Sequence, residues 1–223
     1  MLNKNVFSLK QTPVDKFRLT CSQIFLFLCV CLCTLTIFFN VTYSIAPVSG
    51  FSMYPTLNNY TTYSKHDRVV LNYIKAYHKG DIIVAKKIYD DEEHFIYVIK
   101  RLIATGGDSI EIKENGDVYV NDQKLDESYV TSEYKTATYE AFIKLKEGTN
   151  PNFDEKNDFT SWFEDGKLVL KPGYVFYLGD NRGGSTDCSI YGPVKEDNII
   201  AKVDFVIKDG ENTFVSILKQ IFR

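Results

Sequence analysis

The 223-residue sequence predicts a mainly β protein that follows a single N-terminal transmembrane helix. Three observations favour this fold class. An uncharged apolar run lies near the N-terminus, several later segments are rich in β-branched and aromatic residues, and helical periodicity is scarce after the run. The chain is 44% apolar and 25% charged, which is ordinary for a folded protein, so global disorder is not expected.

The apolar run extends from Leu19 to Val41 and contains no charged residue. About 20 such residues are enough for a helix to cross the hydrocarbon core of a bilayer. Residues 1–18 hold four basic residues and one acidic residue, and the next basic residue after the run is Lys65. The positive-inside rule therefore predicts that residues 1–18 are cytoplasmic, that residues 19–41 span the plasma membrane, and that the rest is extracytoplasmic.

The alternative interpretation of this run is a cleaved signal peptide, because Ser44-Ile45-Ala46 offers small residues in a suitable arrangement. Two features argue against it. The run is longer than the signal core of about 7–15 residues, and Pro47 would follow the cleaved bond, where its fixed backbone disfavours an extended protease substrate. We therefore expect a permanent anchor in contact with membrane lipid.

The predicted strands after the anchor define one β-domain, formed by residues 44–128 and 172–210. A hairpin is expected around Asn115-Gly116 within Ser109–Val120. Residues 129–171 are polar with few clean strands, and we expect them to form a small inserted cap subdomain. Residues 211–223 form an amphipathic tail, with helical periodicity over Thr213–Phe222. The remaining predicted strands are Asp67–Tyr73, Asp81–Lys86, Phe95–Ala104, Tyr174–Leu178 and Ile199–Ile207.

Composition and motifs exclude several functions. A net charge of −3 gives no electrostatic case for nucleic-acid binding. Four of the five cysteines lie in the apolar run, so Cys188 alone cannot form an internal disulfide in the outer part, and no metal-ligand spacing occurs. The HExxH, P-loop and GxGxxG motifs are absent, so we expect neither a metal nor another cofactor. The sequence gives no indication of the oligomeric state.

Ser52 lies in the stretch FSMYP, residues 51–55, about ten residues after the anchor. A serine hydroxyl is a weak nucleophile unless a neighbouring base takes its proton. The chain has three histidines, all among charged or polar neighbours as surface histidines often are, and Tyr54 occupies the last glycine position of the GxSxG elbow. A histidine-based site is therefore not indicated by His66, His78 or His94.

Lysine is the other base available to a serine, and Lys100 lies in the apolar strand YVIKRLI, residues 97–103. Alternation along the strand places Lys100 on the same face as Val98 and Leu102 and places Arg101 on the other. Burial lowers the pKa of a lysine, which leaves a neutral amine that can accept a proton. The alternative is that Lys100 extends to water from an edge strand, and the strand pattern alone favours that alternative.

A third stretch, GDNRGGSTD at Gly179–Asp187, groups glycines, carboxylates and hydroxyls after a predicted strand. By itself it is typical of a turn-rich loop. Together with the anchor and the other stretches, it resembles the bacterial type I signal peptidases, and the single-span layout is most similar to Gram-positive members. The resemblance covers most of the chain and is carried by Ser52–Leu57, Asp81–Lys86, Tyr97–Ile112, Val118–Glu127 and Gly179–Asp187.

The resemblance implies a signal-peptidase-type β-fold and a serine endopeptidase with a Ser/Lys dyad. Such an enzyme removes signal peptides from secretory precursor proteins after small-x-small residues. Ser52 corresponds to the nucleophile, and its backbone N–H to an oxyanion donor. Lys100 corresponds to the general base, and Ser185 to the hydroxyl that orients it. Structural roles in the loop are implied for Asp180, Arg182 and Asp187.

The sequence departs from the family pattern within this loop. Gly183-Gly184 replaces Asp-Asn, Cys188 replaces serine, and Ser189 replaces the arginine that commonly pairs with the aspartate at the position of Asp187. We expect Asp187 to use another cation, either Arg101 or Arg182. The departures also support an alternative function, a catalytically weak relative that assists assembly of surface proteins such as pilins. A third interpretation, a transpeptidase that uses Cys188, lacks an accompanying histidine.

Overall fold

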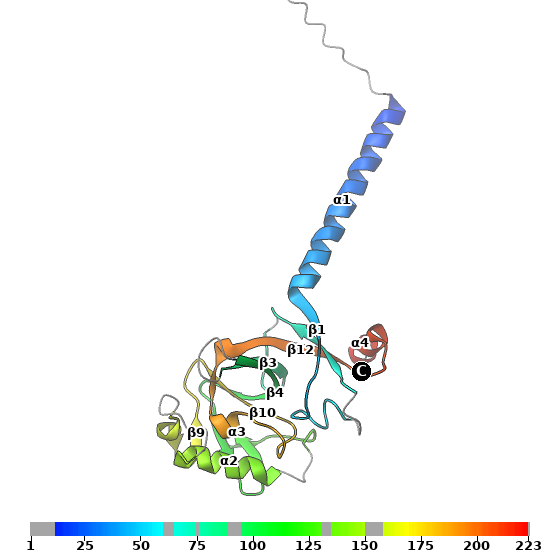
Figure 1. Cartoon of the computed structure of the whole chain (residues 1–223). Coiled ribbons are helices and arrows are strands. Elements are labelled where there is room, and N and C mark those ends of the chain that lie inside the picture. Colours follow the sequence, from blue (N-terminus) through cyan, green and yellow to red (C-terminus); the bar gives the residue numbers. More distant parts are fainter. Residues whose placement is uncertain are drawn as a thin grey trace, which may run out of the picture. The chain divides into compact units, whose positions relative to one another are not determined.

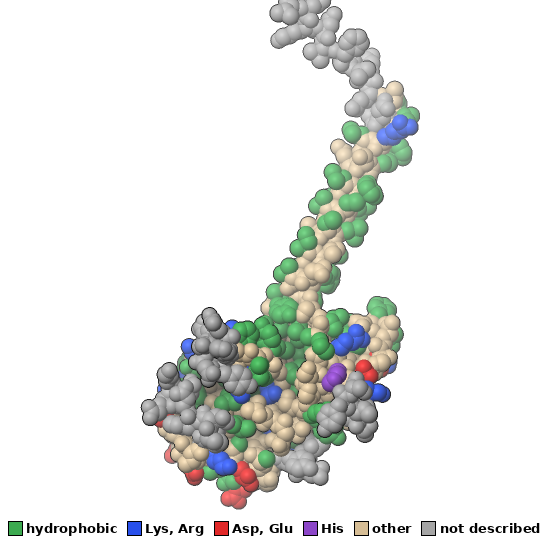
Figure 2. All heavy atoms as spheres, viewed as in Figure 1, with side chains coloured by type: hydrophobic (Ala, Val, Ile, Leu, Met, Phe, Trp, Pro, Cys, Tyr) green, Lys and Arg blue, Asp and Glu red, His purple; other side chains and the backbone are tan. Residues whose placement is uncertain are grey.

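The computed structural model describes residues 12–59, 65–74, 76–88, 95–130, 135–149 and 158–222. His94 lies outside the described residues. The chain divides into two compact units, residues 1–42 and 43–223. In the first unit, helix α1 extends over Pro13–Thr42, and its part Phe17–Thr42 is long and apolar enough to cross a membrane. Apolar side chains cover the length of this helix (Figure 2). The predicted span at 19–41 lies within it.

The second unit is built on a seven-stranded antiparallel sheet in the order β1-β2-β12-β3-β4-β10-β11 (Figure 1). Strands β10 and β12 have the predicted bounds, and β2, β3 and β4 lie close to theirs. Mainly β architecture is therefore confirmed. The strands of this sheet are β1 (Tyr43–Pro47), β2 (Arg68–Asn72), β3 (Ile82–Ile88), β4 (Phe95–Thr105), β10 (Tyr174–Leu178), β11 (Val194–Lys195) and β12 (Ile199–Ile207).

A second sheet has five short strands in the order β7-β6-β5-β9-β8. The predicted hairpin forms its centre, with Gly116 at a φ of 80°, a left-handed conformation that favours glycine in the turn. The strands of this sheet are β5 (Ser109–Ile112), β6 (Val118–Val120), β7 (Gln123–Lys124), β8 (Phe163–Glu164) and β9 (Lys167–Val169).

The expected inserted cap subdomain is not confirmed as a separate body. Strand β9 pairs with β5, which belongs to the predicted β-domain. Helix α2 (Lys135–Glu147) buries Phe142 and Leu145 in the same hydrophobic cluster as Ile110 and Phe176. One core therefore joins the described parts of residues 129–171 to the rest of the unit.

Helix α2 was missed by the sequence analysis for a physical reason. Only Thr138, Phe142 and Leu145 are buried on it, so its apolar stripe is narrow and most of its surface is polar. The other helical elements are α3 (Cys188–Tyr191), α4 (Thr213–Ile221) and the 3-10 turns η3 (Thr160–Trp162) and η4 (Glu196–Asn198). Helix α4 lies in the segment that we expected to be an amphipathic tail.

Candidate active site

Ser52 lies in a tight turn that is anchored by apolar side chains. The Tyr54 N–H donates to the Phe51 carbonyl at 3.0 Å, and the Leu57 N–H donates to the Met53 carbonyl at 2.9 Å. Met53 and Leu57 are buried with exposed fractions of 1% and 0%. Burial of these two residues, both of which follow Ser52, therefore helps to fix the backbone that carries the Ser52 hydroxyl.

Asn58 joins this turn to the strand that precedes it. Its side-chain amide donates to the carbonyls of Val48 and Gly50 at 2.9 and 2.8 Å, while its Oδ1 accepts from the Asp67 N–H at 2.7 Å. The φ of Asn58 is 56°, a left-handed value that asparagine tolerates better than most residues. The sequence analysis did not identify this residue; its position six residues after Ser52 carried no recognisable signal.

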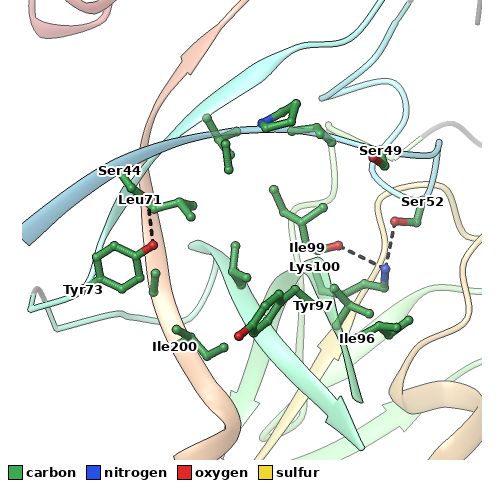
Figure 3. Close-up of a pocket in the computed structure, with 17 residues that line it drawn as sticks. Ser44, Ser49, Ser52, Leu71, Tyr73, Ile96, Tyr97, Ile99, Lys100 and Ile200 are labelled. Carbon is green, nitrogen blue, oxygen red and sulfur yellow. Dashed lines mark hydrogen bonds between the residues drawn. The ribbon is translucent and has the colours of Figure 1, made fainter. Parts of the chain in front are cut away.

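Lys100 lies on β4, an interior strand between β3 and β10, and only 3% of it is exposed. Its Nζ contacts the Ser52 Oγ at 2.9 Å and donates to the Ile99 carbonyl at 3.1 Å (Figure 3). The two side chains are 48 residues apart in sequence. The alternative in which Lys100 extends to water from an edge strand is therefore wrong.

The surroundings of Lys100 favour its neutral form. Burial lowers the pKa of the Lys100 ammonium, because the charged form loses its hydration, and the positive charge of Lys87 lowers it further. The negative charge of Asp187 acts in the opposite direction, but the net shift is downward. A neutral amine in contact with a hydroxyl is the arrangement that proton abstraction from serine requires.

Ser185 packs beside the Ser52 turn without contacting Lys100 by a hydrogen bond. Its Oγ is buried and, among the residues that the structure describes, has no hydrogen-bond partner. A Cβ placed on Gly179 would collide with the Ser185 Oγ and with the Ser52 carbonyl, so these two residues approach each other across a glycine. The orienting hydrogen bond implied by the resemblance is not formed in this structure, and that role stays a prediction.

Asp180 and Arg101 connect the loop after β10 to β4. The Arg101 guanidinium donates to both Asp180 carboxylate oxygens, at 2.9 and 2.6 Å, and to the Gly80 carbonyl at 2.7 Å. Thr56 donates to the same carboxylate from the Ser52 turn. Asp180 is 1% exposed, so its charge depends on these partners.

The prediction that Arg101 or Arg182 pairs with Asp187 is wrong. Arg101 pairs with Asp180, and the buried Arg182 pairs with Glu127. Asp187 instead accepts from the Gly179 N–H at 2.8 Å and from the N–H and hydroxyl of Ser189 at 3.1 and 2.8 Å. Ser189, at the position where the resemblance implies an arginine, thus stabilises the carboxylate through hydrogen bonds at the start of α3.

Asn181 is a second residue that the sequence analysis missed. Its N–H donates to the Ser52 carbonyl and its side-chain amide donates to the Phe51 carbonyl, both at 3.0 Å. A Cβ on Gly184 would lie 2.6 Å from the Asn181 amide nitrogen, so the glycine leaves room for this side chain. The departure at position 184 is therefore compatible with a well-held turn.

Cys188 does not have the properties of a nucleophile. It is fully buried, and burial raises the pKa of its thiol, so the unreactive protonated form is favoured. The two histidines that the structure describes, His66 and His78, are exposed. Neither of them lines the two pockets that contain Ser52, which are described below. The transpeptidase interpretation therefore has no support in this geometry.

An apolar pocket of about 580 Å³ extends from Ser52 and Lys100 between β1 and β4. Figure 3 shows the two side chains at one end of it. The lining includes Pro47, Val69, Leu71, Tyr97, Ile99 and Ile200. Ser52 and Lys100 also line a second, smaller hollow with Lys87 and Thr186. Within the described residues, no group of three or more His, Cys, Asp or Glu side chains could hold a metal ion.

Comparisons with known proteins identify the family of the chain. Residues 20–208 match the family model described as signal peptidase, peptidase S26. Signal peptidase I S of Bacillus subtilis is 33% identical over 144 residues, which cover 63% of this chain and 62% of that protein. Signal peptidase IB of Staphylococcus aureus is 30% identical over 169 residues, covering 71% of this chain and 74% of that protein. The matched part thus spans less than two thirds of the Bacillus protein.

A solved structure is also similar. Signal peptidase I from Enterococcus faecalis matches with a TM-score of 0.36 and 23% sequence identity, over 58% of this chain and 98% of that one. Because the family model covers most of the sequence, the chain belongs to the signal peptidase family, peptidase S26.

Proposed function

We propose that this chain is a type I signal peptidase, a serine endopeptidase that cleaves signal peptides from exported precursor proteins after small-x-small residues. Ser52 is its nucleophile and Lys100 its general base. The observation that carries the proposal is the 2.9 Å contact between the Ser52 hydroxyl and the amine of a lysine that is 3% exposed. A lysine with a lowered pKa next to a serine is an arrangement that activates the serine.

The first half of the reaction forms an ester. The Ser52 Oγ attacks the scissile carbonyl carbon while Lys100 Nζ takes the hydroxyl proton. When the resulting tetrahedral intermediate collapses, the carbon–nitrogen bond breaks and the Lys100 ammonium gives its proton to the leaving amine. The mature protein departs with a free N-terminus, and the signal peptide stays bound to Ser52.

The second half of the reaction restores the enzyme. Lys100 takes a proton from an attacking water, whose oxygen bonds to the ester carbonyl carbon. The ester carbon–oxygen bond then breaks, and the proton passes from Lys100 to the Ser52 Oγ. Atoms and charges balance without a metal or another cofactor.

The Ser52 N–H is suited to stabilise the negative oxygen of each tetrahedral intermediate. Among the described residues, this N–H makes no hydrogen bond within the protein. It lies on a turn whose carbonyl groups at Phe51 and Ser52 are held by Asn181. A donor that is fixed before the reaction avoids reorganisation when the charge develops, and one such donor contributes about 3 kcal/mol in comparable sites.

The precursor is bound as an extended strand beside β1. Strand β1 is at the edge of the seven-stranded sheet and pairs only with β2 in the described part of the chain, so its other side can accept a strand. The apolar pocket between β1 and β4 lies along that side and ends at Ser52. Small residues before the scissile bond fit such a lining, whereas larger ones are excluded by their size.

Helix α1 anchors the enzyme in the plasma membrane, with its N-terminus in the cytoplasm and the β-domain outside. The basic residues before the apolar run of this helix support this orientation. Anchoring raises the effective concentration of the enzyme near precursors that are held in the same membrane.

Ser185 is proposed to orient Lys100 after a rotation of its buried hydroxyl. Replacing Ser185 with alanine should lower kcat and shift the pH dependence of cleavage, while Ser185→Thr, which keeps the hydroxyl, should restore part of both. An unchanged pH profile in Ser185→Ala would assign the residue to packing alone.

The function is tested by cleavage of a purified precursor with the full chain in lipid vesicles, followed by mass analysis of the new N-terminus. We expect one cut after an alanine-x-alanine sequence. A matched precursor with leucine at the residue before the cut should be resistant. Binding of the precursor without any cut would contradict the enzyme and support the assembly-factor alternative.

A further inference from the structure

Helix α4 (Thr213–Ile221) is amphipathic, but it is docked by its polar side. Ser216 is buried with 1% exposed, and its hydroxyl donates to Glu211. The Gln220 amide donates to the Val206 carbonyl at 2.6 Å and accepts from the Val206 N–H at 2.9 Å. The two Gln220 contacts attach the helix to β12, and Ser216 is buried on the same face of the helix.

The Gln220 side chain binds the backbone of β12 at Val206, where a neighbouring strand could otherwise pair. The pairing of β12 with β3 ends at Lys202, so none of the described strands pairs with the Val206 backbone groups on that side. The glutamine side chain satisfies both groups as a short substitute strand. Helix α4 is therefore fixed in rotation, and its other face cannot turn toward the sheet without breaking these bonds.

The face of α4 opposite Ser216 is apolar and exposed. Phe214, Leu218 and Ile221 follow one another at steps of four and three residues, which places them on one side of α4, and Phe222 is the residue that caps the end of the helix. The exposed fractions of Phe214, Ile221 and Phe222 are 69%, 56% and 84%. Figure 2 shows apolar side chains over this part of the surface. A fixed patch of this kind on a protein surface marks a contact site.

We propose that this apolar face of α4 lies in the lipid headgroup region of the membrane that α1 enters. Tyr43 follows Thr42, the last residue of the candidate span, and begins β1 directly. Ala46 of β1 pairs with Val69 of β2, and Val69 in turn pairs with Val206 of β12, the residue to which Gln220 of α4 binds. Ala46 is the fourth residue after Thr42, so their Cα atoms are at most about 14 Å apart. Chain connectivity therefore keeps Ala46 close to the end of the candidate span, and it allows α4, which docks two strands away on β12, to reach the bilayer surface.

The chemistry of the helix fits a lipid interface better than it fits another class of partner. An interfacial helix buries its apolar face about 5–10 Å into the boundary between headgroups and acyl chains and keeps its polar face outward. Here the polar face is turned to the protein, and Lys219 lies at the flank, paired with Glu211. A surface-lying helix would fix the tilt of the β-domain relative to the membrane and hold the pocket beside β1 at a constant depth.

Depth-dependent fluorescence quenching tests this inference without using enzymatic activity. Phe214→Trp is introduced into the full chain, which has a single native tryptophan, Trp162. The protein is reconstituted in phosphatidylcholine–phosphatidylglycerol vesicles with and without phosphatidylcholine brominated in its acyl chains. We expect bromolipid to quench most of the added fluorescence, and emission at a shorter wavelength than for tryptophan in water. Phe222→Trp should behave in the same way and provides a second site if the first variant folds poorly.

The matched controls are the parent chain, in which Trp162 is buried, and Tyr119→Trp on the second sheet. Neither control should be quenched by bromolipid. Water-like, unquenched emission at both α4 sites would overturn the inference. Emission that is shifted to short wavelength but not quenched would also overturn it, and would indicate that a second copy of the chain covers the face.

Discussion

The backbone N–H of Asn181 donates a hydrogen bond to the Ser52 carbonyl oxygen at 3.0 Å, so the loop after β10 holds the turn that presents Ser52. The Asn181 side chain reinforces this contact through the Phe51 carbonyl. Two stretches that lie about 130 residues apart in sequence thereby form one site, and each of them determines the position of the Ser52 hydroxyl.

Asn181→Ala should reduce kcat for precursor cleavage by about tenfold or more, because small displacements of a reacting group are costly to catalysis. The unfolding free energy should fall by only about 1 kcal/mol, the usual net value of one hydrogen bond. Steady-state kinetics and denaturant titration on the same preparation separate the two effects. An unchanged kcat would mean that the side-chain contact does not position Ser52.

Gly179→Ala should abolish cleavage, because the added methyl group would collide with the Ser52 carbonyl and the Ser185 side chain. Combining it with Ser185→Gly should not restore activity, since the backbone contact with Ser52 remains. Precursor cleavage by the single and double variants checks this expectation. Recovery in the double variant would show that Ser185 alone is sensitive to the collision.

Arg101→Met should lower the unfolding free energy by about 3 kcal/mol, because Asp180 would remain buried without its charged partner. The double variant Arg101→Met/Asp180→Leu removes the charge as well and should recover part of the loss. Denaturant titration of the four members of this cycle measures the coupling. Additive effects of the two substitutions would contradict a direct dependence of Asp180 on Arg101.

The pH dependence of cleavage should follow the deprotonation of Lys100. The base acts in its neutral form, so kcat/KM should rise with pH and level off at a pH below the ordinary pKa of lysine, because burial lowers the pKa of Lys100. Lys87→Met removes a positive charge that disfavours protonation of Lys100, so the pKa of Lys100 should rise and the rising limb should move to higher pH.

Lys86→Met is the matched control for Lys87. The neighbouring lysine lies on the opposite face of β3 and stacks on the Phe95 ring at 4.0 Å. Its replacement should leave the profile in place. If the rising limb of the pH profile does not shift in Lys87→Met, or shifts equally in both variants, the charge of Lys87 does not lower the pKa of Lys100.

The strands were predictable where side-chain pattern and burial agree. Tyr174–Leu178 and Ile199–Ile207 are continuous runs of β-branched and aromatic residues, and both have the predicted bounds. Strand β1 was missed because it is a short edge strand with half-exposed residues that ends at Pro47. The shared core of the segment 129–171 could not be inferred, since it depends on the pairing of β5 with β9 across some sixty residues.

For the candidate site, alternation along β4 placed Lys100 on the face of Leu102, and both residues are buried. Contact with Ser52 could not be predicted from that pattern, because it depends on how the turn after β1 folds over the sheet. The roles of Asn58 and Asn181 could not be predicted either, because they too depend on contacts between distant segments. Polar residues in loops carry no periodic signal, and the backbone groups that they satisfy belong to distant segments.

The central claim is that the Ser52 hydroxyl, activated by Lys100, makes the bond that cleaves a precursor. Its most direct test is the initial rate of precursor cleavage by full-length Ser52→Ala, compared with the parent chain at equal concentration and with folding verified by circular dichroism. We predict a loss of at least about a thousandfold, as for other enzymes that lose their nucleophile. A rate within tenfold of the parent, from a folded variant, would contradict the proposed mechanism.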